Sequence, residues 1–482
     1  MNQKAARVWL KASLLLVCGM LLSGCATSSV FSPYPDQMSG IRAKLNASGY
    51  ASSIKTLSKG ADSTDHDLYN MELGRVQQLS GNYPASISTY TKVINSVQQQ
   101  QLAAKIQMSN ILAQTGSLMT NDNALPYRVK GYELIFLYNY QVLNYLAIGD
   151  VQDALVSIRR SDQQQQWYVQ QHQYELQQAK EMADKKSWSL DPTQYGPSKA
   201  TYLVAKNVTD PMQNGFAYYL SGLVYEATGD YNNAFISLQN AIAIQPNNSY
   251  LQTKLLEVLE ERGGSPSQFQ YYMKQFGLTK APVIPQHSGQ VVVIYEQGLV
   301  PPMTSASYPL NIQGASQIFT FPVYKATSSV APVLSVSMQD NKALTALGQT
   351  QSVVNVEAIA AKNLTDEYPL IFIREALRVV TQTAVLTSSA NNSNATEGNK
   401  LADALAATLY MSLMAGADLR SWLTLPNTVQ IYQGYLPPAS ISLILATDGI
   451  KQIVPLTIQA NKTIIVWVVN TDNNLQVKLI NA

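Results

Sequence analysis

The sequence predicts an α+β protein in which an array of helical hairpins precedes a β-rich, sandwich-like antiparallel domain with an inserted helical hairpin. Two observations predict this order. Apolar residues recur at helical spacing from about Met38 to Gly277, whereas β-branched runs begin at Val291 after a proline-rich stretch. The chain has 482 residues, which is too long for one core and suits two or three domains.

The first 24 residues have the order of a secretory signal, with basic residues ahead of a short apolar stretch. This stretch, residues 12–22, is too short to span a bilayer, which needs about 20 apolar residues. It ends in Leu22-Ser23-Gly24-Cys25, which resembles the lipobox of bacterial lipoproteins. The resemblance implies cleavage before Cys25 and its acylation by palmitate-like chains; the alternative is an ordinary signal peptide with a chance cysteine. Because Ala26 stands where an inner-membrane retention signal has Asp, the resemblance implies an outer-membrane anchor facing the periplasm.

Composition excludes nucleic acid as a partner. The leader holds three of the 33 Lys and Arg residues and none of the 31 Asp and Glu residues, so the mature chain has a net charge near −1. A chain without a basic excess has no electrostatic attraction for nucleic acid. Of the two cysteines, Cys18 leaves with the leader and Cys25 would be blocked by lipid, so no disulfide or thiol nucleophile is expected.

An internal repeat organises the helical domain, which we place at residues 38–280 after a leader at 1–24 and a tether at 25–37. The clearest copy, residues 215–248, has small residues, tyrosines, a Gly-Asp-Tyr turn and a final proline at the offsets of a tetratricopeptide repeat, whose period is about 34 residues. Two further copies carry parts of the pattern. The residues expected to pack within the repeats are Gly74, Tyr83, Tyr145, Gly149, Tyr218, Gly222, Tyr225, Gly229, Ala234 and Pro246.

These residue types have physical reasons in a helical hairpin. Gly222 is small where the two helices touch, Gly229 makes the turn between them, and Pro246 ends the second helix. The alternative is a set of unrelated helical hairpins with glycine turns. The glutamine-rich stretch 161–186 lacks Gly and Pro, which predicts one long helix that is polar on most faces.

The predicted β-rich domain covers residues 288–482. Its expected strands are residues 290–296, 317–324, 333–338, 428–434, 440–446, 452–458 and 463–469. Short turns separate the last four strands, which predicts an antiparallel meander. Two helices, near 368–388 and 401–414, are expected to form a buried hairpin against the sheet.

Strings spread over nearly the whole mature chain resemble a family of tetratricopeptide-containing envelope lipoproteins of proteobacteria. Among them are Leu73-Gly74-Arg75-Val76, Tyr219-Leu220-Ser221-Gly222-Leu223 and, most specific, Ala417-Asp418-Leu419-Arg420-Ser421-Trp422-Leu423-Thr424-Leu425-Pro426. The family has no assigned enzymatic activity, so the resemblance implies class and location. At Gly215 and Met303 this chain departs from the family pattern, so no ligand role is carried over to those positions.

The sequence contains no recognisable catalytic or metal motif. Its three histidines stand apart, and it has no His-Glu-x-x-His, paired-Cys or Gly-x-Ser-x-Gly pattern, so no metal and no cofactor are expected. Carboxylates can meet in space without any sequence spacing, which leaves a glycan- or peptide-processing site between the domains as an alternative. The motif residues without an assigned role are Asn121, Asp122, Glu133, Glu296, Gly298, Asp418, Arg420 and Trp422.

Structural roles are expected for several of these residues. Asp122 is expected to cap or turn the chain, and Glu133 and Glu296 are expected to pair with Arg or cap backbone amides. The loop at 418–422 is expected to latch onto the β domain. The alternative for its Arg and Trp is stacking on a sugar or an aromatic ligand.

The positive signal is a binding surface, since stacked helical hairpins form a curved array whose concave face suits peptides or partner domains. The candidate groove residues, on the first helices of two repeats, are Asn70, Gln77, Tyr219, Leu223 and Glu226. The alternative for each is simple solvent exposure or packing against a neighbouring element. We therefore expect a non-enzymatic adaptor in the outer-membrane leaflet that holds an unidentified periplasmic or envelope protein, with envelope or cell-wall assembly as the context. The alternatives are the enzyme above and a structural subunit of a secretion or surface complex.

Overall fold

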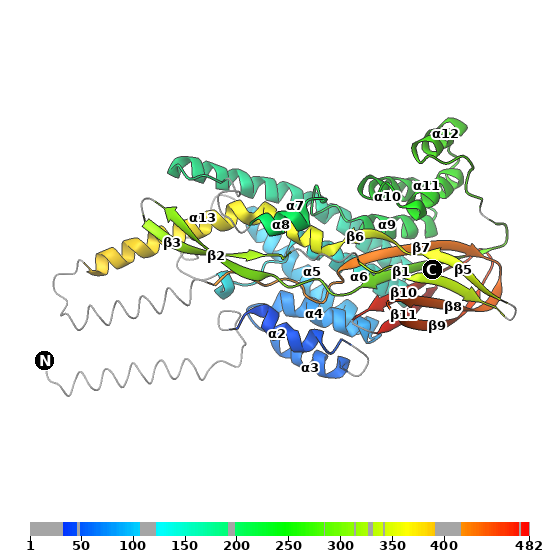
Figure 1. Ribbon diagram of the computed structural model, residues 1–482, viewed down its shortest axis with the longest axis horizontal. Coiled ribbons are helices and arrows are strands. Elements are labelled where there is room, and N and C mark those ends of the chain that lie inside the picture. The colour runs from blue at the N-terminus through cyan, green and yellow to red at the C-terminus, as the bar shows by residue number, and fades with distance from the viewer. Residues whose placement is uncertain are drawn as a thin grey trace.

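Figure 1 shows the computed structural model of the chain, in which helices fill the N-terminal part and strands most of the C-terminal part. The structure describes residues 32–45, 49–106, 122–190, 198–283, 285–312, 315–325, 331–340, 343–390, 416–471 and 474–481. The leader with Cys25, the motif residue Asn121 and the helix predicted at 401–414 lie outside these residues. None of the described helices is both long and apolar enough to cross a membrane.

The described helices of the N-terminal part pack as hairpins. They are α2 (Tyr34–Arg42), α3 (Tyr50–Gly60), α4 (His66–Leu79), α5 (Tyr83–Ile106), the 3-10 turn η2 (Asp122–Ala124), α6 (Gly131–Ala147), α7 (Val151–Lys186), α8 (Ser198–Ala205), α9 (Gly215–Ala227), α10 (Tyr231–Ile244), α11 (Ser249–Glu261) and α12 (Pro266–Gln275). α4 packs on α5, α6 on α7 and α9 on α10, which are the three places where a repeat is predicted. The long helix expected at 161–186 is the C-terminal part of α7. It continues without a break from the part of α7 that pairs with α6 in the hairpin.

Gly-Asp turns start the second helix of two hairpins. Gly149 and Gly229 have φ angles of +80° and +75°, in the left-handed region that favours glycine. The next residues, Asp150 and Asp230, each accept a hydrogen bond from the backbone N–H three residues on, at 3.0 and 3.2 Å. These bonds cap α7 and α10 by satisfying one of the free N–H groups at a helix start.

Small residues let the hairpins close. An ideal Cβ placed on Gly74 would lie 2.5 Å from the ring of Tyr90, and one on Gly222 would lie 3.0 Å from Leu238. Ala234 is fully buried on α10, which packs against α9. The sequence pattern therefore reports close helix contact at these positions.

The strands form two main sheets and one separate hairpin. Their bounds are β1 (Gly289–Gln297), β2 (Thr304–Ile312), β3 (Ala315–Val323), β4 (Ser335–Gln339), β5 (Leu344–Gln349), β6 (Gln351–Asn355), β7 (Thr428–Leu436), β8 (Ala439–Thr447), β9 (Ile450–Ile458), β10 (Thr463–Asn470) and β11 (Leu475–Asn481). The five-stranded sheet has the order β11-β10-β1-β7-β6, the four-stranded sheet has the order β5-β4-β8-β9, and β2 pairs with β3. Every pair is antiparallel except β1 with β10, which is parallel. The α+β fold class with a helical first part and an antiparallel, sheet-rich second part is confirmed.

The predicted meander of the last four strands is wrong. Pro437-Pro438 joins β7 to β8, but these two strands belong to different sheets. Of the four, only β8 and β9 pair with each other, while β1 lies between β7 and β10. The physical reason is that β1 is buried on both faces, and such a strand belongs at the centre of a covered sheet.

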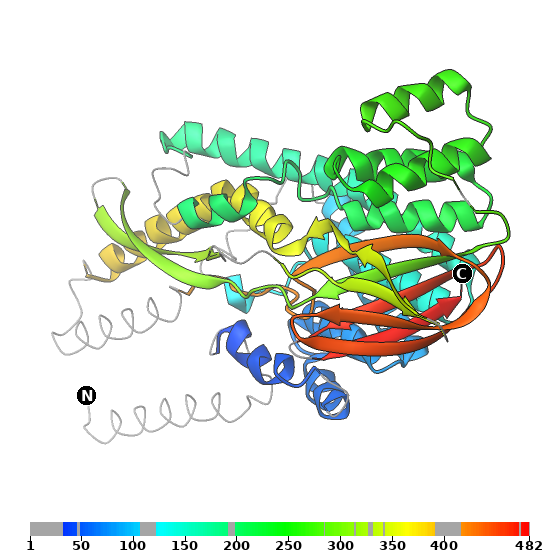
Figure 2. The same ribbon diagram turned by 45° about the vertical axis from the view of Figure 1, so that its right-hand side comes forward.

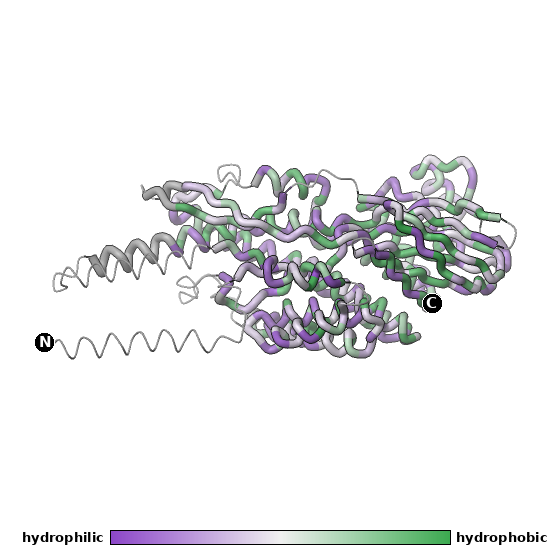
Figure 3. Tube along the Cα trace, turned by 60° about the horizontal axis from the view of Figure 1, so that its bottom comes forward, coloured by the Kyte–Doolittle hydropathy of each residue, from purple (hydrophilic) through white to green (hydrophobic). Residues whose placement is uncertain are grey.

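Helices, five-stranded sheet and four-stranded sheet form three layers, and Figure 2 shows the strands in front of blue and cyan helices. Val292 and Ile294 of β1 belong to a core shared with the helices, whereas Val291 and Val293 belong to the core between the two sheets. Figure 3 shows hydrophobic and hydrophilic residues alternating along much of the chain. The helical and β-rich parts thus share one core.

Two predicted boundaries differ in the structure. α2 begins at Tyr34, inside the expected tether 25–37, because Tyr34 is buried and packs edge-on against Tyr69 with ring centroids 5.8 Å apart. The helix expected near 368–388 begins earlier, at Val356, and continues through Pro369 to Ala390 as α13 (Val356–Ala390). α13 packs against α7 and α8, and Figure 1 shows it in yellow beside them.

Candidate functional site

The junction segment, residues 416–427, leads into β7 and is held by the helices. Trp422 is fully buried and contacts the rings of Tyr90 and Tyr140 edge-on, with centroid distances of 5.9 and 5.7 Å. Its indole N–H donates a hydrogen bond to Thr424 Oγ1 at 2.9 Å. The expected latch onto the β domain is therefore wrong, because Tyr90 and Tyr140 belong to α5 and α6. A fully buried Trp422 is also closed to a stacking ligand.

Glu133, at the start of α6, binds the junction segment through its carboxylate. Glu133 Oε1 accepts a hydrogen bond from the backbone N–H of Trp422 at 2.8 Å. Glu133 Oε2 accepts from the hydroxyl of Tyr127 at 2.7 Å and from the backbone N–H of Lys130 at 3.0 Å. Burial raises the pKa of Glu133, and these hydrogen bonds act in the opposite direction. The side chain is a buried cap for two backbone amides.

Glu72 of α4 binds the next two residues of the junction segment in the same way. Its carboxylate accepts from the backbone N–H of Leu423 at 2.7 Å and of Thr424 at 3.1 Å, and from the hydroxyl of Tyr34 at 3.3 Å. Glu72 is fully buried, and this burial raises its pKa to about 7. Sequence reasoning missed Glu72; its available signal was a carboxylate between Met71 and Leu73 on a helix.

Arg420 binds several segments of the chain near the start of the junction segment. Its guanidinium donates to the carboxylates of Asp65 at 2.6 Å and Asp418 at 2.7 Å, and to the backbone carbonyls of Leu125 at 2.8 Å and Asp122 at 2.7 Å. Burial acts to raise the pKa of Asp418, but the hydrogen bonds and charge of Arg420 outweigh it and lower that pKa. Arg420 is therefore the hub that joins α4's N-terminus, the η2 turn and the junction segment.

A buried ion pair connects the helices to the centre of the sheet. Arg75 of α4 pairs with Glu296 of β1, and their side chains are 1% and 0% exposed. Glu296 also accepts from the indole N–H of Trp467 at 3.0 Å, while the guanidinium lies 4.2 Å from the ring centroid of Tyr140. Burial raises the pKa of Glu296, and Arg75 acts against that rise. Arg75 was quoted in a sequence string but was not singled out as a site residue.

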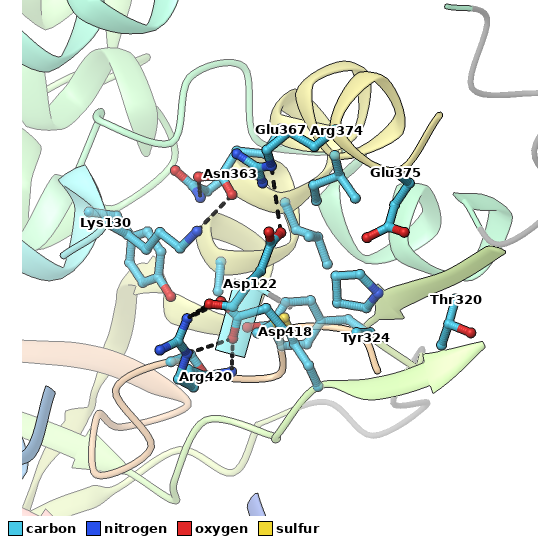
Figure 4. Close-up of a pocket in the computed structure, with 18 residues that line it drawn as sticks. Asp122, Lys130, Thr320, Tyr324, Asn363, Glu367, Arg374, Glu375, Asp418 and Arg420 are labelled. Carbon is cyan, nitrogen blue, oxygen red and sulfur yellow. Dashed lines mark hydrogen bonds and ion pairs between the residues drawn. The ribbon is translucent and has the colours of Figure 1, made fainter. Parts of the chain in front are cut away.

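Two neighbouring cavities lie beside the junction segment and α13. The larger is also lined by α7, and the smaller by β3. The larger has a volume of about 710 Å³ and the smaller about 50 Å³. Figure 4 shows the smaller one with its lining side chains. Both cavities are lined by Asp122, Lys130, Asn363, Glu367, Arg374, Asp418 and Arg420.

Several charged groups of the cavities are paired but not sealed from solvent. Lys130 Nζ lies 2.7 Å from Glu367 Oε2, with 29% and 22% of the two side chains exposed (Figure 4). Asp122 Oδ2 lies 3.5 Å from Arg374 Nε. Burial acts to raise the pKa of Glu367, but Lys130 outweighs it, so that pKa lies below its ordinary value. Asp122 begins the η2 turn, as expected of a turn residue. Its side chain also forms ion pairs at the edge of the cavities.

The carboxyl groups of the cavities fall into two classes. Paired cations lower the pKa values of Glu367 and Asp418, whereas burial raises those of Asp366 in the larger cavity and Glu375 in the smaller one. Within the described ranges, no group of three or more His, Cys, Asp or Glu side chains is placed to hold a metal ion. The cavities therefore present fixed, ionised groups of both signs.

The structure places the candidate groove residues of the third hairpin under the protein's own sheet. Tyr219 is fully buried and donates a hydrogen bond to Gln433 Oε1 of β7 at 3.2 Å, and Leu223 is buried beside it. Glu226 pairs with Lys254 of α11. The expectation of an open groove here is corrected, because Tyr219 bonds to β7, Leu223 is buried and Glu226 pairs with α11 of the same chain.

The groove candidates of the first hairpin also have internal partners. Asn70 is buried and donates to the backbone carbonyls of Ala61 at 3.1 Å and His66 at 2.8 Å. Gln77 accepts from the hydroxyl of Thr89 at 2.8 Å. The five candidates therefore do not form one open surface.

The remaining sequence-predicted residues have structural positions. Among the repeat tyrosines, Tyr225 is buried, while Tyr83, Tyr145 and Tyr218 are half-buried against the core. Pro246 follows the end of α10. Gly298 has a φ angle of +64° after β1, and its N–H donates to the carbonyl of Asn470 at 2.9 Å.

Comparison with known proteins finds one repeat and weak structural neighbours. Residues 217–248, which cover α9, α10 and the turn beyond, match the family described as tetratricopeptide repeat, so the protein contains such a repeat. No curated protein matches the chain. Among solved structures, the chain is similar to "Crystal structure of MamA protein", with 13% identity over 53% of this chain and 99% of that chain and a TM-score of 0.28. It is also similar to "MamA 41-end from Desulfovibrio magneticus RS-1", with 11% identity over 51% and 93% of the two chains and a TM-score of 0.26.

Proposed function

We propose that this protein is a lipid-anchored, non-enzymatic scaffold that holds a protein partner at the periplasmic face of the outer membrane. The tetratricopeptide repeat at residues 217–248 is the observation that carries the scaffold role, because such hairpins usually present surfaces to other proteins. The lipobox-like Leu22-Ser23-Gly24-Cys25 supports the anchor. Envelope or cell-wall assembly is the proposed context, by analogy with the location of such lipoproteins in the cell envelope.

The paired charges of the cavities support a non-enzymatic role. Two-carboxylate hydrolysis of a glycan needs one protonated and one ionised group facing the substrate. Glu367 and Asp418, whose pKa values are lowered, are paired with Lys130 and Arg420. Asp366 and Glu375, whose pKa values burial raises, are likewise paired with Lys362 and Arg378 and so do not stand free for a substrate. A binding role is therefore favoured over the enzyme alternative.

The partner of this scaffold binds outside the concave face of the third hairpin. Tyr219 of that face is already bonded to β7 and Leu223 is buried, so a partner that used them would have to disturb the protein's own core. A pull-down with Tyr219→Ala and Leu223→Ala variants would thus disturb the fold and could not report on partner binding. Variants in the half-exposed cavity are the better probes.

The anchor is tested by mass analysis of the mature N-terminus and by fractionation of a Cys25→Ser variant. Acylated Cys25 at the new N-terminus and loss of the variant from the outer-membrane fraction are the expected results. A wild-type N-terminus without lipid would contradict the anchor.

The scaffold role is tested by crosslinking in intact cells, followed by purification of the protein from detergent-solubilised envelope. The expected result is one stoichiometric protein partner that copurifies with the wild type. This partner is expected to be lost when the crosslinker is omitted. Recovery of the protein alone at every crosslinker concentration would contradict the scaffold role, whatever the state of Cys25.

A further inference from the structure

The larger cavity has the size of a ligand site, with one apolar wall and one polar wall. Its volume of about 710 Å³ falls in the range of about 300–1,000 Å³ that is usual for binding pockets. The walls come from the loop before α6, the middle of α7, the loop before α9, the first half of α13 and the junction segment. Five separate segments of the chain therefore build it.

The apolar wall is set by α7 and the loop before α9. Tyr168 and Val169 of α7 pack with Met212, which is itself buried against Ile135 of α6. Leu370 of α13 lines the cavity from the other side. The hydroxyl of Tyr168 donates to the carbonyl of Val129 at 3.1 Å, which fixes its ring in this wall.

The polar wall carries more negative than positive groups. Six carboxylate side chains line the larger cavity, against four Lys and Arg side chains. Two cations and two carboxylates stand behind this wall. The cations Lys362 and Arg378 pair with lining carboxylates, while Glu375 pairs with Arg378 and Asp65 pairs with Arg420. These four groups cancel in charge, so the excess of two negative charges is unchanged.

The carboxylates of this wall remain accessible. The exposed fractions of the Asp122, Glu367, Asp366 and Asp418 side chains are 19%, 22%, 23% and 30%. Asp210 has no ion-pair partner within the part of the chain that the structure describes; its Oδ1 accepts from the backbone N–H of Met212 at 2.8 Å. Each carboxylate therefore has lone pairs left for a further donor.

We propose that this cavity binds a basic segment of a polypeptide, with a Lys or Arg head at the carboxylates and its aliphatic stem along Val169 and Met212. Long basic side chains bury an apolar stem while their charged head stays among polar groups, which matches a cavity with one wall of each kind. The excess negative charge repels an anionic ligand. The inference rests on the proposed scaffold role, for which it names the chemistry of the bound partner.

The test uses the purified full chain in detergent and a short lysine-containing peptide, with affinity measured by calorimetry. The matched peptides carry acetyl-lysine or glutamate in place of lysine, and spermidine serves as a free polyamine. Binding of the lysine peptide at least about tenfold tighter than of the acetylated one, and weaker at high salt, is the expected result. Equal binding of the glutamate peptide, or tighter binding of spermidine, would overturn the proposal of a basic peptide.

Two variants and one control locate the binding. Val169→Trp fills the apolar wall and is expected to weaken binding at least about tenfold. Asp210→Asn removes one charge but keeps the acceptor for Met212, and is expected to weaken binding about threefold to fivefold. Asp230→Asn makes the same change at the cap of α10, outside the cavity, and is expected to leave affinity unchanged.

The outcomes separate this inference from the proposed function. Peptide affinity that is unaffected by Val169→Trp, in a variant whose circular dichroism and unfolding midpoint match wild type, overturns the cavity assignment. That result leaves the membrane anchor and the crosslinked partner as they were. Conversely, an unlipidated N-terminus contradicts the anchor without changing the affinity of the purified chain for the peptide.

Discussion

The ion pair that connects the helices to the central sheet and the ion pair of the cavity each join a cation to a glutamate, but they differ in burial. Arg75 and Glu296 are 1% and 0% exposed, whereas Lys130 and Glu367 are 29% and 22% exposed. A charge that is fully buried can be neither hydrated nor re-paired, so removing its partner is strongly unfavourable. A half-exposed pair loses little when it opens. The same chemistry therefore holds the molecule together in one region and is free to meet a ligand in the other.

The sharpest test of this difference is Arg75→Met, which leaves Glu296 buried without its cation. We expect a loss of about 3–5 kcal/mol in the free energy of unfolding, measured by urea denaturation of the purified chain. The double variant Arg75→Met/Glu296→Gln should recover part of this loss because no charge is left uncompensated. A single variant as stable as wild type would remove the distinction between the two regions.

A pH titration probes the junction through Glu72, whose pKa is raised to about 7. The folded state then holds a proton that the unfolded state loses near pH 4.5, so stability is highest below pH 4.5 for this group and falls as pH rises to about 7. The expected loss is about 3 kcal/mol across that window. Other buried carboxylates titrate in the same direction, so the measurement is the difference between wild type and Glu72→Gln, which should lack this contribution.

Trp422→Phe tests how tightly the junction segment is packed. The change removes the hydrogen bond to Thr424 and leaves a gap beside Tyr90 and Tyr140. We expect a loss of about 2 kcal/mol, from one hydrogen bond and part of a ring. The measurement is the urea midpoint, with Trp167→Phe on the half-buried face of α7 as the matched control.

The smallest effect is expected in the cavity, from Glu367→Gln. Its partner Lys130 is half-exposed and can be hydrated, so the free energy of unfolding should fall by less than about 1 kcal/mol. The same urea series measures it. A loss as large as that of Arg75→Met would show that the cavity is structural and would weaken its case as a ligand site.

Local features of the fold could be predicted from the sequence because their causes are local. The Gly-Asp turns at Gly149 and Gly229 require a left-handed backbone and a capping side chain, and both are visible in adjacent residues. Gly222 and Ala234 likewise mark close helix contact. The strands β1 and β10 were visible as runs of β-branched residues. By contrast, β2, β5, β6 and β11 are short or interrupted by polar residues and were missed.

Contacts between distant segments could not be predicted, because no local spacing in the sequence records them. Trp422 and Arg420 stand out in the sequence. Whether they pack against the helices or the sheets depends on partners far away in the chain, namely Tyr90, Tyr140 and Asp65. The groove residue Tyr219 is buried, and its hydroxyl bonds to Gln433 of β7, 214 positions further along the chain. Glu72 and Arg75 gave a weak signal, as charged residues among apolar ones on a single helix.

The parallel pairing of β1 with β10 has a consequence for how the chain reaches its native state. Gln290 and Thr463 are neighbours in the sheet but 173 positions apart in the sequence. Because the strand at the middle gains its final neighbour only when almost all of the polypeptide is present, acquisition of the native state is expected to be slow. Until then its valines and isoleucine are uncovered and prone to aggregate, so a newly made chain would benefit from a chaperone that shields this stretch.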